Sequence, residues 1–198
     1  MSNGNNDFER LWKVQASVNK LVLDGRRDAG TVADVLQKVL DEGSSNPFLN
    51  LVDAAVIAPT KGNVTIADAS DVFTGYIDPN FKKWGTDVAG TDTTEQAVDI
   101  HEMKKDGTYT KLFGSLSANY RSLCHSQGQI VEFCRTNPHL LRQDSYGTFF
   151  LFEVNGEVFV AFVLVDGGVL EVRVFRFSND YVWDAVNRHL VVVPQQTV

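Results

Sequence analysis

Cysteine is scarce in this sequence, and a long apolar run is missing. Among its 198 residues there are two cysteines, Cys124 and Cys134, which are too few for a disulfide framework, so we expect two free thiols. The longest apolar run, 158–165, has eight residues, whereas a helix needs about 20 to cross a bilayer. The N-terminal residues show neither the basic nor the apolar segment of a secretory signal peptide. Together these absences predict a cytoplasmic protein with no membrane contact.

The short motifs of common enzyme families are also missing. The chain has no glycine-rich phosphate-binding loop, no Gly-x-Gly-x-x-Gly, no Gly-x-Ser-x-Gly and no His-Glu-x-x-His. We therefore expect no cofactor and favour a protein that is not an enzyme. The net charge is −7, and residues 1–99 hold most of the acidic excess, with 9 Lys and Arg against 15 Asp and Glu. Because no basic stripe is present, nucleic acid is not the expected partner.

Two apolar runs meet at Asn155-Gly156 and predict a β-hairpin. Both central residues of a type I′ turn need a positive φ, which Asn and Gly accept at little cost. The second arm, 158–165, is apolar on both faces, so we expect a central strand that is covered on both sides. A three-residue turn at 166–168 then leads into an alternating strand at 169–177.

Helices are predicted where apolar residues recur at three- and four-residue steps. The first covers 7–23, and the second begins at Thr31, which we expect to cap it, and runs to about 42. A short helix is expected from Tyr109 to about Leu116. Ser126 and Gln129 form a Ser-x-x-Gln capping box that opens a further helix.

The predicted fold class is α+β. A mostly antiparallel β-meander at about 147–177, joined by strands at 97–103 and 189–193, packs against the N-terminal and central helices, which cover one face, and the middle segment covers part of the other face. The segment 63–67 has the composition of a further strand.

Residues 1–198 are expected to form a single domain. Its parts are a helical N-terminal region at 7–42, an irregular middle at 46–95, and helices with the sheet core at 97–193.

Four motifs invite comparison with known families: Phe8-x-x-Leu11-Trp12-x-x-Gln15, Asp71-Val72-Phe73 with Ile77-Asp78-Pro79-Asn80-Phe81-Lys82-Lys83-Trp84-Gly85, Phe113-Gly114-Ser115-Leu116, and Tyr146-Gly147-Thr148-Phe149-Phe150-Leu151-Phe152. Through these motifs, which are spread over nearly the whole chain, the sequence resembles a family of small uncharacterised bacterial proteins. The resemblance implies a recurring single-domain architecture and supplies no activity, substrate or site residue.

Cys124 and His125 are weak candidates for a nucleophile and its base. Neighbouring residues on a strand or helix point in different directions, whereas a reactive thiolate needs a positioned imidazole or a helix N-terminus. With Cys134 and His139 they make a Cys-x₉-Cys-x₄-His pattern, which lacks the close pair of thiols of a zinc knuckle. We therefore predict no metal site. A small enzyme with a pocket near Cys124, His125 and the acidic loop remains an alternative.

The helix after Ser126 suggests a second alternative, a DNA-associated regulator. A recognition helix is normally flanked by Lys and Arg side chains that bind phosphate. This segment offers mainly Gln127, Gln129, Glu132 and Arg135, so DNA reading is the weaker hypothesis.

The favoured hypothesis is a non-catalytic binding or interaction module whose partner is another protein or a small ligand. Loops carry function more often than cores do, and exposed aromatic and basic side chains suit a binding surface. Such residues gather in the irregular segment 73–87. The predicted binding residues are Phe73, Tyr76, Phe81, Lys82, Lys83 and Trp84. The same rings could instead pin the segment onto the sheet.

Overall fold

The computed structural model of the protein describes residues 4–34, 36 and 46–195. The chain divides into two compact units, Met1–Ser45 and Asn46–Val198. The single domain that the sequence suggested for residues 1–198 stays a prediction.

The first unit begins with helix α1 (Gly4–Leu23), as the apolar spacing predicted. A second helical stretch starts at residue 29. The carboxylate of Asp28 accepts hydrogen bonds from the backbone N–H of Thr31 at 2.8 Å and from its hydroxyl at 3.0 Å. These bonds lower the pKa of Asp28. The prediction that Thr31 caps this helix is therefore wrong, because Asp28 already occupies the capping position. Residues 37–42 of the predicted helix lie outside the described residues.

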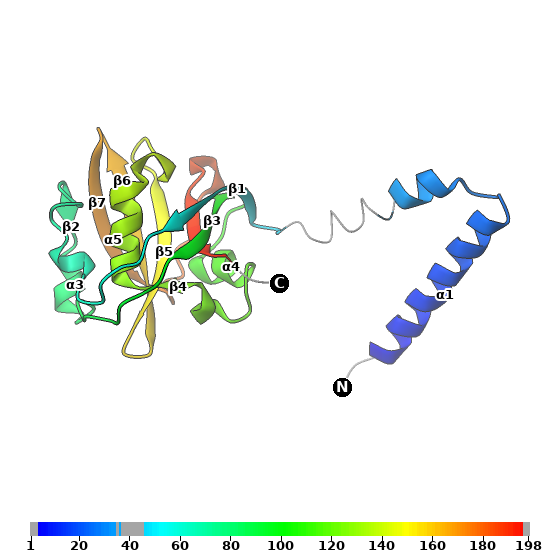
Figure 1. The fold of residues 1–198 in the computed structure, drawn as a ribbon, viewed down its shortest axis with the longest axis horizontal. Helices are drawn as coiled ribbons and strands as arrows, with labels where there is room; N and C mark the ends of the chain where they lie inside the picture. Colours follow the sequence, from blue (N-terminus) through cyan, green and yellow to red (C-terminus); the bar gives the residue numbers. More distant parts are fainter. Residues whose placement is uncertain (1–3, 35, 37–45, 196–198) are drawn as a thin grey trace. The chain divides into compact units, whose positions relative to one another are not determined.

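The second unit is built on an eight-stranded sheet, as far as the described residues show, in the order β1-β3-β8-β5-β6-β7-β2, with β4 paired to β5 (Figure 1). Its strands are β1 (Leu49–Ile57), β2 (Tyr76–Ile77), β3 (Gln96–Met103), β4 (Cys124–His125), β5 (Gly147–Val154), β6 (Glu157–Asp166), β7 (Val169–Arg176) and β8 (Leu190–Pro194). The helical elements of this unit are η1 (Ile66–Asp68), α3 (Asn80–Lys83), α4 (Tyr109–Gly114), η2 (Tyr120–Leu123), α5 (Gln127–Thr136), η3 (Pro138–Leu140) and η4 (Ala185–Asn187).

The α+β class is confirmed, but the sheet is mixed. The meander β5-β6-β7 is antiparallel, whereas β8 pairs with β5 in parallel, as do β4 with β5 and β2 with β7. The expectation of a mostly antiparallel meander was therefore too narrow, because three short strands from distant parts of the chain join the sheet in the parallel direction.

The predicted hairpin forms at Asn155-Gly156. Both residues have positive φ, 53° and 79°, and Val154 pairs with Glu157 across the turn, which is the geometry of a two-residue type I′ connection. At the next turn Asp166 pairs directly with Val169, so the loop has two residues and the predicted three-residue turn is wrong. The two consecutive glycines allow the tighter turn because both accept positive φ, 56° and 81°.

Strand β6 lies between β5 and β7 and is buried on both faces, as predicted. On one face of the sheet, side chains of β6 and the neighbouring Phe150 and Phe152 of β5 pack against residues of η1, α3 and α5. On the opposite face, side chains of β6 and the neighbouring Phe149 and Leu151 of β5 pack against residues of α4 and η2. Helices thus cover both faces, and the expectation that they cover one face is wrong, because a strand that is apolar on both sides needs cover on both. Figure 1 shows α5 against the first of these faces.

Two further predicted strands, β3 and β8, are confirmed, and β8 lies between β3 and β5 inside the sheet. The strand predicted at 63–67 is wrong. The chain there turns into η1, whose first backbone N–H, that of Ile66, donates to the side-chain oxygen of Gln127 at 3.0 Å. A helix side chain thus satisfies an amide that would otherwise need a strand partner.

The predicted capping box opens α5. The backbone N–H of Gln129 donates to the hydroxyl of Ser126 at 3.1 Å, and the N–H of Ser126 donates to the Gln129 side chain at 2.8 Å. The short helix expected from Tyr109 is α4, capped by Thr108.

We predict that Gly147→Ala destabilises the protein by about 1–3 kcal/mol, because the added methyl group would overpack the core. A Cβ at this position would lie 1.6 Å from the ring of Phe162, and that ring is itself held between Phe149 and Trp183. Urea denaturation measures the change. Gly114→Ala is the matched control, since a Cβ there meets nothing within 4 Å, and equal stability of the two variants would contradict the prediction.

Candidate functional site

Cys124 and His125 do not form a catalytic pair. They are neighbours on β4, and their side chains point to opposite faces of the sheet. Cys124 packs against the cluster that contains Leu151, and its thiol lies 3.9 Å from the carbonyl oxygen of Tyr120. His125 is buried on the other side, with Nε2 3.2 Å from the carbonyl oxygen of Val192. A thiol and an imidazole that point apart cannot exchange a proton directly.

Burial also makes Cys124 a poor nucleophile and His125 a weak base. It raises the pKa of the Cys124 thiol to about 12 and lowers the pKa of His125 to about 4. At neutral pH the first is a thiol rather than a thiolate, and the second is a neutral ring. Burial raises the pKa of Cys134 in the same way. Neither Cys124 nor Cys134 is therefore an activated nucleophile of the kind that the alternative enzyme hypothesis needs.

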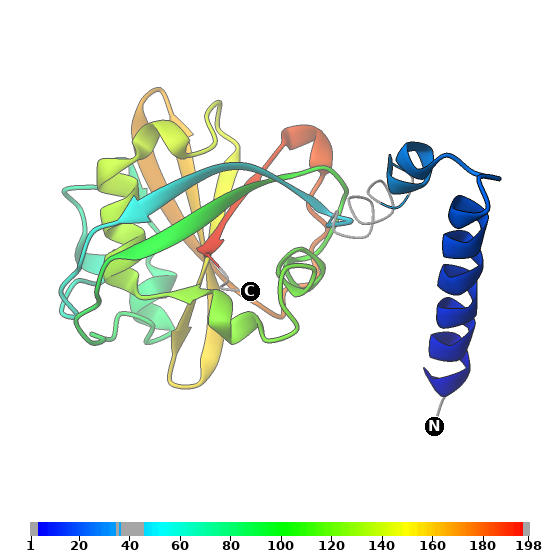
Figure 2. The same ribbon diagram turned by 45° about the vertical axis from the view of Figure 1, so that its right-hand side comes forward.

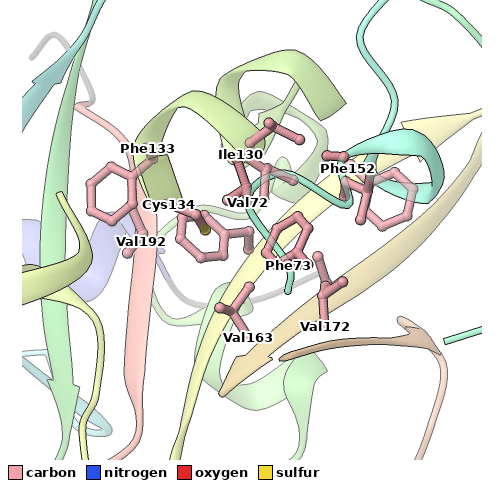
Figure 3. Packing of buried hydrophobic residues seen from close by; sticks show 14 of the residues in the cluster. Val72, Phe73, Ile130, Phe133, Cys134, Phe152, Val163, Val172 and Val192 are labelled. Carbon is pink, nitrogen blue, oxygen red and sulfur yellow. The ribbon is translucent and has the colours of Figure 1, made fainter. Parts of the chain in front are cut away.

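Cys134 lies on the buried side of α5. Figure 3 shows its sulfur within the apolar cluster that also holds Val72, Phe73 and Phe133. His139 is exposed on η3. Among the described residues, no group of three or more His, Cys, Asp or Glu side chains is placed to hold a metal ion.

The predicted binding residues divide into two groups. Phe73 and Phe81 are buried in the core, 2% and 0% exposed, so the prediction that they contact a partner is wrong; they pin the segment to the sheet by apolar burial. Tyr76 is 43% exposed. Lys82 and Lys83 are exposed, and Trp84 is partly buried. The surface group is thus Tyr76, Lys82, Lys83 and Trp84.

Within the described part of the chain, the segment 71–80 is flanked by two open clefts. The first, which we call the Arg135 cleft, has a volume of about 560 Å³. It is lined by residues from four regions of the chain, namely Asp71, Val72, Thr74, Cys134, Arg135, Pro138, His139, Gln143, Val165, Gly168 and Leu170.

The second hollow, which we call the Tyr76 cleft, has a volume of about 550 Å³. It lies along the junction of β2 and β7 and is lined by Gly75, Tyr76, Asp78, Asn80, Glu171 and Arg173. The guanidinium of Arg173 lies over the ring of Tyr76, 5.9 Å from its centroid. On the opposite face of the sheet, the guanidinium of Arg176 covers the ring of Trp84 at 5.4 Å. Cation–π contacts of this kind hold exposed rings in place.

Charges at the Arg135 cleft neutralise one another. Arg135 donates to Asp71 at 2.8 Å and to Glu132 at 2.9 Å, and its hydrogen bond lowers the pKa of Asp71. A guanidinium that already holds two carboxylates has little attraction left for an anion. The cleft therefore suits a neutral group better than a phosphate or a carboxylate.

The Tyr76 cleft shows the same pairing. Arg173 lies 3.6 Å from Glu171, and Lys82, on α3, lies 3.2 Å from Asp68. These pairs are solvent-exposed and contribute little to stability. Their consequence for recognition is that the surface around Tyr76 carries no concentrated charge of either sign.

Two residues beside the Arg135 cleft adopt a conformation that is uncommon for non-glycine residues. Asp144 and Ser145 have φ of 65° and 62°, in the left-handed region. The backbone N–H of Ser145 donates to the carbonyl oxygen of Val165 at 3.0 Å, and Val165 lines the cleft. The turn is therefore tied to the cleft wall, which helps to fix its shape.

The chain matches no protein-family model, no curated protein and no solved structure. The resemblance to uncharacterised bacterial proteins stays a prediction. No helix in the described residues has both the length and the apolar character needed to cross a membrane.

We predict that stability falls as the pH drops from about 6.5 to about 4, because of buried histidines. His125 has a folded-state pKa of about 4 against an ordinary value of 6.5. Between these two pH values the histidine is protonated in the unfolded chain and neutral in the folded chain. This stabilisation is complete above pH 6.5 and is lost by at most about 1.4 kcal/mol per pH unit. Burial also lowers the pKa of His101 and His189, which act in the same direction.

Urea denaturation at several pH values between about 4 and 7 tests this effect. The variant His125→Gln is expected to show a shallower loss of stability with acid than the wild type. His139→Gln, at an exposed position, is the matched control and should keep the wild-type slope. An unchanged slope in His125→Gln would rule out the proposed role of this ring.

Proposed function

We propose that the protein is a non-catalytic cytosolic binding module that holds a peptide segment of a partner protein at the segment 71–80. The observation that carries this proposal is that one pinned segment forms a wall of both clefts. The sequence predicted the binding surface at 73–87, and the proposal keeps Tyr76 as its exposed ring.

The Arg135 cleft supports an apolar group at its base and polar contacts at its rim. Its base is formed by Val72, Val165 and Leu170, of which Val72 and Leu170 are 7% and 8% exposed. The rim carries His139, which can donate or accept a hydrogen bond, and Gln143, whose Nε2 already donates to the carbonyl oxygens of Pro138 and Leu141 and whose Oε1 can accept. Pockets of this composition commonly receive one large apolar side chain and orient the main chain around it.

The Tyr76 cleft supplies a ring that is already oriented. Tyr76 has two side-chain torsions, and Arg173 holds its ring from one side. Tyr, Trp and Arg are enriched at interface hot spots, and Tyr and Trp bury a large area at small entropic cost. Tyr76 and Arg173 supply two of these residue types at the cleft, whereas Trp84 and Arg176 belong to the opposite face of the sheet, because residues 173 and 176 of β7 point to opposite sides.

The main chain of the segment is fixed before any partner arrives. Gly75 donates its backbone N–H to Leu170 at 3.0 Å, and Asp78 donates to Val172 at 2.9 Å. Phe73 and Phe81 anchor the two ends in the core. A preorganised surface loses little conformational entropy on binding, which favours recognition by a rigid platform over a loop that folds around its ligand.

We expect Tyr76→Ala to weaken peptide binding by about tenfold or more, as loss of an interface tyrosine typically does. The probes are peptides selected against the wild-type protein from a phage-displayed random library, and their dissociation constants are measured by fluorescence anisotropy. Tyr181→Ala is the matched control, because Tyr181 is 61% exposed and lies outside both clefts.

Two results would contradict the proposal. One is a set of selected peptides that bind wild type and Tyr76→Ala equally well while Tyr181→Ala weakens them. The other is a library from which no peptide is enriched on the folded protein. Circular dichroism checks that both variants retain the wild-type fold.

A further inference from the structure

Strand β1 forms one end of the sheet, and in the described residues no strand pairs with its outer side. Figure 2 shows β1 and β3 running side by side along this end of the sheet. The hydrogen bonds of β3 reveal which backbone groups of β1 point outward. The carbonyl oxygen of Ala97 accepts from Gln195, and the N–H of Met103 donates to His189, both at 2.9 Å. Odd-numbered residues of β3 therefore direct their backbone groups toward β8.

Even-numbered residues of β3 consequently direct their backbone groups toward β1. Their partners in the second half of β1 are Asp53, Ala55 and Ile57. Because backbone groups alternate in direction along a strand, Ala54 and Val56 direct theirs away from the sheet. The outer side of β1 thus presents main-chain donors and acceptors of the kind that pair with another strand.

Apolar side chains accompany these outward-pointing backbone groups. Leu51 is 62% exposed, Val52 49% and Val56 55%. The register shifts between Leu51 and Asp53, so Val52 forms a bulge. Asp53 is the one charged residue among the nine of this strand. Natural proteins normally protect an edge strand with several charges, a proline or a covering segment, and β1 carries only the bulge and one carboxylate.

The other end of the sheet is protected in this way. There β2 pairs with β7, and beyond β2 the carboxylate of Asp78 accepts from the backbone N–H of Val174 at 3.4 Å. Pro79 follows directly and offers no N–H. The two ends of the sheet therefore differ: the end at β2 is protected, and the outer edge of β1 is not.

Asp53 shows what an incoming strand would replace. Its carboxylate accepts the backbone N–H of Ala54 at 2.8 Å, and this N–H points outward. A main-chain carbonyl of a partner would take the same hydrogen bond and release the Asp53 side chain. A Lys or Arg of the partner next to Asp53 would then pair with the released carboxylate.

We propose that β1 is a strand-addition site that receives an extended segment of a partner protein, with apolar side chains at alternate positions and a Lys or Arg beside Asp53. This site is separate from the clefts at the segment 71–80. Main-chain hydrogen bonds supply much of the affinity in strand addition, and alternate side chains supply specificity.

A second copy of β1 is the less suitable occupant. Asp53 is the fifth of the nine residues in Leu49–Ile57, so two fully overlapping antiparallel copies would place the two Asp53 side chains opposite each other. Like charges in directly opposed positions destabilise a strand pair. Each chain also carries a net charge of −7, which opposes self-association and favours a basic partner.

The test uses a nine-residue synthetic peptide of alternating lysine and valine with blocked ends. Its control is the same sequence with N-methyl groups at alternate residues, which removes the main-chain donors on one edge. We expect the control to bind about tenfold more weakly or worse. Native-state hydrogen exchange on the complex should show slower exchange at the amides of Ala54 and Val56, and not at that of Tyr76.

Two variants separate this site from the clefts. Ala54→Pro removes an outward donor that makes no bond to β3, and it is expected to weaken the unmethylated peptide by about tenfold. Asp53→Lys should weaken it comparably through charge reversal, whereas Tyr76→Ala should leave it unchanged. Equal binding of the methylated and unmethylated peptides would overturn the proposal. A dimer that forms through β1 in analytical ultracentrifugation, without peptide binding, would overturn it in favour of self-association.

Discussion

The second unit depends on the burial of β6 on both faces. Eight consecutive residues of this strand, 158–165, are buried, so the strand needs a neighbour on each edge and cover on each face. The tight turns at Asn155-Gly156 and Gly167-Gly168 supply the two neighbours directly. Cover comes from segments far apart in the chain, with η1, α3 and α5 on one face and α4 and η2 on the other. The two apolar clusters thus form on the two faces of this one strand.

This requirement also decides where function can lie. Two potentially reactive side chains, Cys134 and His125, are used in packing: burial keeps the thiol of Cys134 protonated and makes His125 a weak base. The surfaces that we propose for recognition lie at the two ends of the sheet order, around β2 and β7 and along β1. At both ends the core fixes the backbone and leaves side chains or peptide groups free, which is how a rigid scaffold presents a binding surface.

The sequence predicted those features that depend on neighbouring residues. The Asn155-Gly156 turn, the capping box of Ser126 and Gln129, and the strand at 97–103 rest on local rules of turn geometry, capping and alternation, and all three are present. Local rules also misled: the composition of 63–67 resembled that of a strand, whereas the chain forms η1, whose first N–H, that of Ile66, donates to Gln127, 61 residues away. Long-range hydrogen bonds of this kind leave no mark in a local pattern.

At the candidate site, too, local sequence patterns do not predict contacts between residues that are far apart in the chain. Asp71 and Arg135 meet across 64 residues, and no spacing rule joins them. Composition did indicate that 73–87 is rich in aromatic residues, but it could not separate Phe73 and Phe81, which face the core, from Tyr76, which faces solvent. That distinction follows from the path of the chain: β2 is only two residues long, so the segment meets the sheet briefly and needs buried rings on both sides of that contact to stay there. The buried rings thus fix the position of the exposed one: Phe73 and Phe81 have the anchoring role that the sequence offered as an alternative, and binding at Tyr76 is the role that we propose.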